Sequence, residues 1–424
     1  MSAVADLVIS GGRVVCAVTG TDRVADVHVA GEHVLGVHPP GTPIPDGARE
    51  LDARARVVLP GLVDLAVHLR APGREDDETL DVTLAAALAG GVTTLVALSD
   101  TLPAVDGADD VQQRLAAARD AVPHGPDVVV AGCLTRRREG LEIADHADMT
   151  GAGARVLTDV ATVVDTEVLR RALEYAKSAG ARVVMLDPVD AALGKGAVAT
   201  ESPLSTRLGL RAVPLAAQSI GAARDRALST LTGMAVHHHA VTTAAAVSQA
   251  GGPTASTTMW HLLFDEESLR ERPYDTALRL WPPLAPAAER KALLDLVRRG
   301  VVAVSSGHRP VPNRTKDLEF SLAEPGATGL ALALPLLWSA LSPIEIAKAM
   351  SALPAAILGL ADRGRVEPGA RADIVVVDPT ATDLVDEALA VSRSWANPAK
   401  GMRTSARVVA TIAAGRIAYQ RGTS

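Results

Sequence analysis

The chain has 424 residues, of which 48% are hydrophobic and 21% charged, so it can bury a sizeable core and is not a disordered chain. This length suits one large domain with a smaller one. The formal net charge is −7 with acidic and basic residues mixed throughout, a pattern that predicts neither nucleic-acid nor anionic-membrane binding.

The order of apolar and helical stretches changes near residue 57. Before it, short strand-like runs alternate with glycine turns. After it, apolar runs alternate with Ala/Leu-rich stretches, several of which end in Gly as helices often do. The eight candidate strands are residues 61–68, 93–98, 128–133, 155–158, 182–187, 235–241, 254–259 and 301–306. The candidate helices include residues 79–89, 111–121, 166–179, 214–231 and 287–299.

The candidate strands are continuous apolar runs, as expected of parallel strands buried on both faces. Eight β/α units over roughly 250 residues match the size of a closed (β/α)8 barrel of the TIM type, and a doubly wound open sheet is the alternative. After a helical stretch at 343–360, strand signals return in ADIVVVD and ARVVATIAAGRIAY. We therefore expect a barrel at 57–360 and a composite β-sandwich domain built from residues 1–56 and 361–424.

Catalytic groups of a barrel enzyme lie at the C-terminal ends of its strands. The first candidate strand ends in Asp64-Leu65-Ala66-Val67-His68-Leu69-Arg70, followed by Ala-Pro-Gly. This stretch resembles the D-x-H-x-H-x-R motif of dihydroorotases, which are cyclic amidohydrolases. The resemblance continues through AALAGGVTTLVALSDTLP, RRALEYAKSAGARVV, STRLGLRAVP, GLALALPLL and RGRVEPGARADIVVVDP, over about nine-tenths of the chain.

The resemblance implies positions for two metals, a proton shuttle and a substrate, and this chain departs from many of them. At the metal positions it retains His68 and Asp159, has Asp187 in place of a His, and has Ala66 and Ala240 where two more His residues stand. The Asp that ligates a metal and shuttles the proton is replaced by Gly307. The substrate-pocket positions of the family fall on Arg70, Asp100, His237, Trp260, Trp281 and His308.

These substitutions remove the groups that amide hydrolysis needs. A catalytic Zn²⁺ takes about three protein ligands and lowers the pKa of its water to about 7. His68, Asp159 and Asp187 could hold one ion weakly, whereas a two-metal site is implausible with these groups alone. Glycine at position 307 has no side chain with which to move a proton. We therefore expect no catalytic residue and no bound cofactor.

Several of these residues also have simpler explanations. His68 is better explained as a vestige than as a ligand, Arg70 could pair with a carboxylate, and His308 could be packed or solvated. In the run His237–His239, residues 237 and 239 share one face of a strand and 238 the other, so a three-His cluster is not expected. Trp260 and Trp281 replace polar residues, and we expect both to be buried over the vacated metal position.

Three hypotheses follow. The first is a non-catalytic dihydroorotase-like protein; the resemblance implies that such proteins act in pyrimidine synthesis as structural partners of aspartate carbamoyltransferase, in a hetero-oligomer, with self-association as a dimer also expected. The second is a cyclic amidohydrolase with a reduced, one-metal zinc site on His68, Asp159 and Asp187. The third is a binding module that keeps Arg70 for a carboxylate ligand.

The cellular location is expected to be the cytoplasm. Cys16 and Cys133 lie far apart in apolar stretches, which is typical of buried free thiols in a reducing compartment. The N-terminal sequence lacks the basic and apolar pattern of a signal peptide, and apolar runs stay below about 18 residues.

Overall fold

All eight barrel strands expected from the sequence are present in the computed structural model, which describes residues 4–159, 163, 165–251, 254–394 and 396–422. Their bounds differ from the expected ones by at most a few residues. They are β6 (Leu62–Val67), β7 (Val92–Ala97), β8 (Asp127–Cys133), β9 (Val156–Thr158), β10 (Val183–Leu186), β13 (Val236–His238), β14 (Ser256–Thr258) and β15 (Ala303–Ser305).

The strands form a closed ring rather than an open sheet. A parallel sheet runs in the order β13-β10-β9-β8-β7-β6, and β14 pairs in parallel with β15. A parallel bridge between His238 and Ala255 joins the two groups on one side. On the other side, Asp64 of β6 accepts a hydrogen bond from the Ser306 amide at 2.9 Å, and the His68 amide donates to the His308 carbonyl at 3.1 Å. The fold is therefore a TIM-like barrel, as expected.

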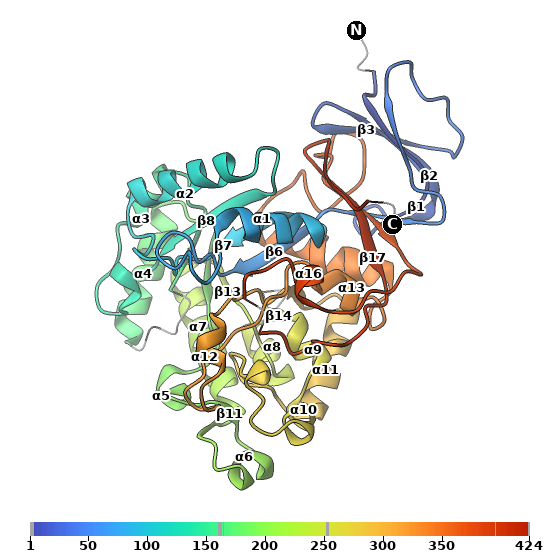
Figure 1. Cartoon of the computed structure of the whole chain (residues 1–424). Helices are drawn as coiled ribbons and strands as arrows, with labels where there is room; N and C mark the ends of the chain where they lie inside the picture. The colour runs from blue at the N-terminus through green and yellow to red at the C-terminus, as the bar shows by residue number, and fades with distance from the viewer. Residues whose placement is uncertain (1–3, 160–162, 164, 252–253, 395, 423–424) are drawn as a thin grey trace.

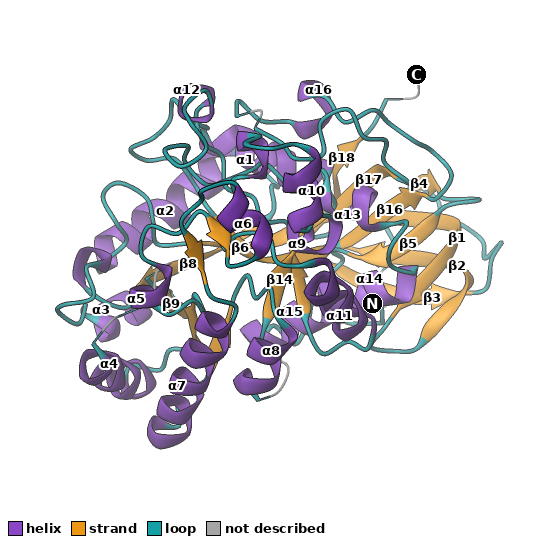
Figure 2. Ribbon diagram, turned by 90° about the horizontal axis from the view of Figure 1, so that it is seen from below, coloured by secondary structure: helices purple, strands orange, loops and turns teal. Residues whose placement is uncertain are grey.

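Helices cover the outside of the ring (Figures 1 and 2). The five expected long helices are confirmed as α1 (Leu80–Ala89), α2 (Ala108–Ala121), α4 (Thr166–Ser178), α7 (Ala216–Thr232) and α11 (Ala287–Arg298). Shorter helical segments are α3 (His146–Gly151), α5 (Ala191–Gly194), α6 (Pro203–Arg207), α8 (Ala244–Ala250), α9 (Met259–Leu263), α10 (Glu266–Glu271), α12 (Asn313–Lys316), α13 (Ala333–Leu337), α14 (Pro343–Ala347), α15 (Leu353–Leu358) and α16 (Glu387–Ala390). A small parallel pair, β11 (Ala199–Thr200) and β12 (Ala212–Val213), lies in the loop between α5 and α7.

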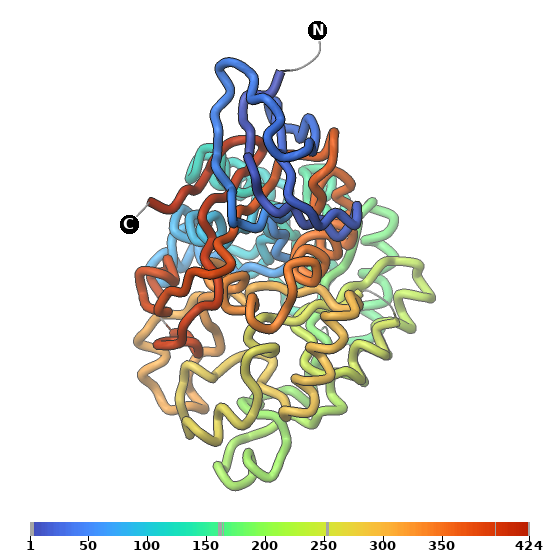
Figure 3. The backbone as a smooth tube through the Cα atoms, turned by 90° about the vertical axis from the view of Figure 1, so that its right-hand side faces the viewer, coloured from blue at the N-terminus to red at the C-terminus, as the bar shows by residue number. Residues whose placement is uncertain are grey.

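A second sheet is built from both ends of the chain, which lie together in Figure 3. Its strands are β1 (Leu7–Cys16), β2 (Thr21–Ala30), β3 (His33–His38), β4 (Arg49–Asp52), β5 (Val57–Pro60), β16 (Ile374–Asp378), β17 (Arg407–Ala413) and β18 (Arg416–Gln420). The order is β18-β17-β16-β5-β1-β2-β3, with β4 beside β1. Because β5 joins the two halves, residues 57–60 belong to this sheet and not to the barrel, where the sequence boundary put them.

The barrel interior is filled by small and branched side chains. One buried cluster joins alternate strand residues, such as Val63, Leu65 and Val183, with Ala355 and Leu358 of α15. Alternation is expected because successive side chains on a strand point to opposite sides. The core thus closes the N-terminal end of the barrel and leaves the opposite end for a site. Within the described ranges, none of the helices is long and apolar enough to cross a bilayer.

Candidate functional site at the strand ends

A small cavity of about 50 Å³ lies at the C-terminal ends of the barrel strands. Its lining includes Ala66, Ala240 and Gly307, the three positions at which the family resemblance implies a metal ligand that this chain lacks. The rest of its lining comprises His68, Asp187, His239, Thr258, Trp260, His261, Leu280, Trp281, Pro282, Ser305, Arg309, Gly326 and Ala327. The structure therefore brings most of the candidate metal positions together at the expected end of the barrel.

His68 forms a buried pair with Asp100. The Nδ1 atom of His68 lies 2.7 Å from the Oδ2 atom of Asp100. Burial lowers the pKa of His68 to about 4, although the carboxylate opposes that shift. The imidazole is therefore neutral at pH 7 and is held by Asp100. Burial raises the pKa of Asp100, but His68 and Arg70 outweigh burial and hold that pKa well below its usual range.

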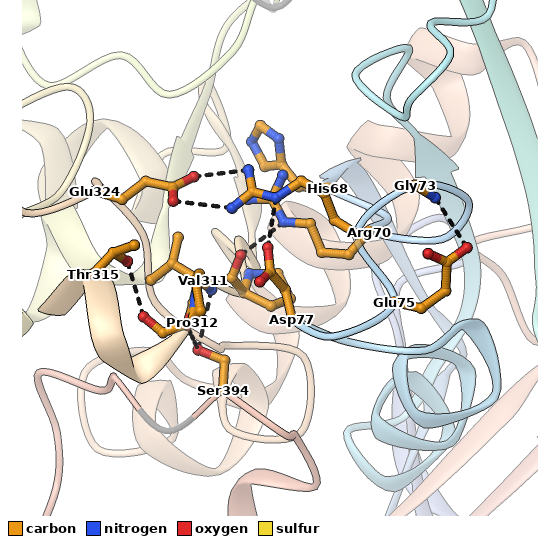
Figure 4. Close-up of polar contacts among 12 residues, drawn as sticks. His68, Arg70, Gly73, Glu75, Asp77, Val311, Pro312, Thr315, Glu324 and Ser394 are labelled. Atoms are coloured by element: carbon orange, nitrogen blue, oxygen red, sulfur yellow. Dashed lines mark hydrogen bonds and ion pairs between the residues drawn. The ribbon is translucent and has the colours of Figure 1, made fainter.

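Arg70 is buried and lies outside the cavity lining. Its Nε atom donates to the Pro310 carbonyl at 2.7 Å, and Nη1 lies 3.5 Å from Asp100. Figure 4 shows Arg70 next to His68, among polar contacts between the loops that follow β6 and β15. The neighbouring Arg74 and Glu324 add an ion pair of 2.8 Å between the same loops. Arg70 therefore ties two loops together instead of presenting its guanidinium to a ligand in the cavity.

The carboxylates of Asp159 and Asp187, which the sequence offered as metal ligands, already accept hydrogen bonds from N–H groups of the protein. Asp159 lies outside the lining and accepts from the amides of Leu134 and Thr135, both at 2.9 Å, and from the Thr135 hydroxyl. Asp187 lines the cavity and accepts from Trp281 Nε1 at 2.6 Å and from the Val189 amide at 2.8 Å. Burial raises the pKa of Asp187 to about 6. Neither carboxylate is free to ligate a metal without losing these bonds.

The three consecutive histidines point in alternate directions, as the strand pattern predicts. The Nε2 atom of His237 lies 2.9 Å from the Ser256 hydroxyl, outside the cavity. The Nε2 atom of His238 lies 3.2 Å from Asp225 of α7, on the outer side of the barrel. His239 lines the cavity, and burial lowers its pKa to about 3. The run is therefore not a three-His metal cluster.

Two indoles fill much of the space at the strand ends. Trp260 is 1% exposed, and its Nε1 atom donates to the Gly307 carbonyl at 3.2 Å. Trp281 is partly buried and donates to Asp187 as described. The expectation of buried indoles over the vacated position is confirmed for Trp260, whereas Trp281 keeps some contact with solvent.

Gly307 could not carry a side chain without rearrangement. Its φ is +66°, a conformation that L residues seldom adopt. A Cβ there would lie 2.8 Å from both Thr258 Cβ and Trp260 Cδ1. The backbone and the indole have therefore closed over the position at which the family carries its proton shuttle.

Four of the six pocket positions named from the sequence lie outside the lining, since Arg70, Asp100, His237 and His308 all have partners elsewhere. His308 is fully buried, lies 2.8 Å from Glu78 through Nε2, and accepts the Gly329 amide at 3.2 Å through Nδ1. Local hydrogen bonding accounts for where these four side chains lie, and a comparison of strand ends in sequence does not reveal it.

The lining residues that the sequence did not point to include His239 and Arg309. His239 was considered only as part of a cluster, although its place on the same strand face as His237 could have shown that it points inward. Arg309 lies in the loop after β15, where strand alternation does not apply, so the sequence carries no signal that it points into the cavity.

The donor set does not fit the zinc sites that the family implies. The side chains at Ala66, Ala240 and Gly307 have no ligating atoms. The carboxylate oxygens of Asp159 and Asp187 accept hydrogen bonds from N–H groups. Across the described part of the chain, no group of three or more His, Cys, Asp or Glu side chains is arranged to hold a metal ion. We therefore derive no chemical step through a metal.

Known proteins resemble this chain in sequence and fold. The Dihydro-orotase-like family matches residues 55–245, and the Amidohydrolase family matches 334–419. The dihydroorotases of Geobacter sp. (strain M21) and Pelotomaculum thermopropionicum are 33% and 34% identical over 98% of this chain and 100% and 98% of their own lengths. The L-hydantoinase of Arthrobacter aurescens, 18% identical, shares the fold with a TM-score of 0.86 over 99% of this chain and 97% of its own. The chain therefore belongs to the dihydroorotase family, within the amidohydrolase fold.

Proposed function

We propose that this protein is a non-catalytic member of the dihydroorotase family that acts as a structural partner of aspartate carbamoyltransferase in pyrimidine synthesis. The observation that carries the proposal is the cavity at the strand ends. It is lined by Ala66, Ala240 and Gly307, which by the sequence resemblance stand where the family carries metal ligands and its proton shuttle, and the buried Trp260 packs against the same space. A chain that retains the barrel while closing its site is consistent with selection for stability and partner contacts.

Two other functions receive less support from the geometry. A one-metal hydrolase would need His68, Asp159 and Asp187 around one ion, but Asp159 lies outside the lining and Asp187 is bound to Trp281. A carboxylate-binding module would need Arg70 at the cavity, but Arg70 donates to the Pro310 carbonyl. The experiments below separate these functions from the proposed one.

Co-expression with the aspartate carbamoyltransferase of the same organism tests the partner role. We expect the two chains to co-elute in size-exclusion chromatography with light scattering, at a mass above that of the transferase trimer, since the barrels would brace the trimers. Each protein run alone is the control, and the isolated chain should elute as a dimer. Separate elution of the two proteins at micromolar concentration would contradict the partnership.

The protein should contain no stoichiometric zinc, because the cavity lacks three ligating side chains. Elemental analysis of protein expressed in zinc-supplemented medium and purified without chelator measures this, with an active dihydroorotase prepared in parallel as the control. One or two Zn²⁺ per chain would favour the hydrolase.

Neither the natural protein nor Gly307→Asp should hydrolyse dihydroorotate, since the variant restores a carboxyl group but no metal ligands. The variant should also lose about 1–3 kcal/mol of stability from its strained backbone, plus the cost of the contacts with Thr258 and Trp260. Gly209→Asp is the matched control, because Gly209 has a φ of +65° and open space around it. Turnover above a mock preparation, or equal losses in both variants, would contradict this account.

Trp260→Ala should cost about 3–5 kcal/mol of unfolding free energy, as expected for an indole removed from a core. Chemical denaturation measures the loss, and Trp260→Phe, which keeps most of the buried ring area, should lose far less. If Trp260→Ala instead leaves stability unchanged, the indole does not seal the site.

A further inference from the structure

Arg309 is a cation in the cavity at the strand ends, and Asp100 and Glu324 offset part of its charge without a hydrogen bond to it. Its side chain lines the cavity together with Ala66, Ala240 and Gly307. Its Nε atom is buried without a hydrogen-bond partner, and among the described residues its guanidinium makes no hydrogen bond or ion pair. By contrast, Arg70 donates to the Pro310 carbonyl and Arg279 to the Leu280 carbonyl. A guanidinium remains cationic in proteins and presents up to five N–H donors.

A second polar group in the same lining also lacks a partner. His239 is 7% exposed, and its Nε2 atom is buried without a hydrogen bond. The low pKa of His239 keeps this imidazole neutral at pH 7, so one ring nitrogen can donate and the other accept. Buried polar groups are rarely left unpaired, so two such groups in one cavity indicate a missing acceptor.

The carboxyl groups nearby do not supply that acceptor. Asp187 shares the lining and interacts electrostatically with Arg309, but its oxygens accept hydrogen bonds from the Trp281 indole and the Val189 amide. The Oδ2 atom of Asp100 is held by His68 and Arg70, whereas its Oδ1 atom is buried without a hydrogen bond. Asp100 therefore offsets the charge of Arg309 but does not accept a hydrogen bond from it. The guanidinium of Arg309 is therefore available to an anion that enters from solvent, past the partly exposed Arg309 and Trp281.

The volume of the cavity limits the size of that anion. A cavity needs at least about 10–15 Å³ of such volume to hold one water, so about 50 Å³ holds about three to five water-sized atoms. This matches a small planar oxyanion and excludes a ring with a carboxylate, such as dihydroorotate, in the same space. A planar carboxylate or carbonate group also matches the fork of a guanidinium, whereas a dianionic phosphate would bring more charge close to Asp187.

We propose that this cavity binds a small planar oxyanion, of the size of acetate or bicarbonate, between the Arg309 guanidinium and His239 Nε2. In this site the guanidinium of Arg309 supplies the positive charge that the family's metal ions would supply at the C-terminal ends of the strands. This inference does not depend on the transferase partner, because the whole site lies within one chain.

Titration of the purified protein with acetate, bicarbonate, inorganic phosphate and dihydroorotate tests the proposal, in a low-chloride buffer at pH 7. Calorimetry and the fluorescence of Trp260 and Trp281 would follow binding. We expect one site for acetate or bicarbonate, and weaker binding of phosphate and dihydroorotate. The absence of saturable binding by both small anions, or tighter binding of phosphate or dihydroorotate, would overturn the proposal.

Arg309→Met removes the charge at similar length and should weaken binding on the order of ten- to a hundredfold, the range for hydrogen bonds to a charged group. Arg136→Met, at an exposed arginine after β8, makes the same change in net charge and should bind as the natural protein does. If Arg309→Met does not fold, His239→Leu provides the second test, with a several-fold loss expected. Unchanged affinity in either folded variant at 309 or 239 would refute the assigned contacts.

Discussion

Buried carboxylates at the strand ends need positive charge or N–H donors nearby, and the C-terminal face of this barrel depends on that requirement. Metal ions meet it in the active members that the resemblance implies. Here Asp159 receives two backbone amides and Asp187 an indole N–H and an amide, while Asp100 is held by an imidazole. Once protein donors satisfy these groups, the barrel no longer needs metals to keep its carboxylates buried.

The same donors also fix the positions of the groups that close the site. The indole of Trp281 is oriented by its bond to Asp187, and that of Trp260 by its bond to the Gly307 carbonyl. The positive φ of Gly307 lets that carbonyl face the indole while the chain turns after β15. Packing and hydrogen bonding thus support each other, which makes the closed cavity a stable arrangement rather than a collapsed remnant.

The sequence predicted the strand and helix order well because most barrel strands are short β-branched or apolar segments separated by amphipathic or alanine-rich helices. It also pointed to Ala66, Ala240, Gly307 and both tryptophans, which line the cavity at the strand ends. It could not predict that His308 turns to Glu78, since that contact joins residues 230 positions apart. Arg309 was missed for a related reason: an arginine after a strand is usually solvated, and only the three-dimensional cavity shows that this one is not.

The sheet built from both ends of the chain has a consequence for synthesis of the protein. Strand β5 lies between β1 and β16, so its second partner is made more than 300 residues after it. While the ribosome translates the barrel, the edge of β5 stays without that partner, and contacts of such large sequence separation form slowly. An unpaired strand edge is prone to pairing with other chains. All barrel strands are therefore synthesised before β16, the strand that covers this edge.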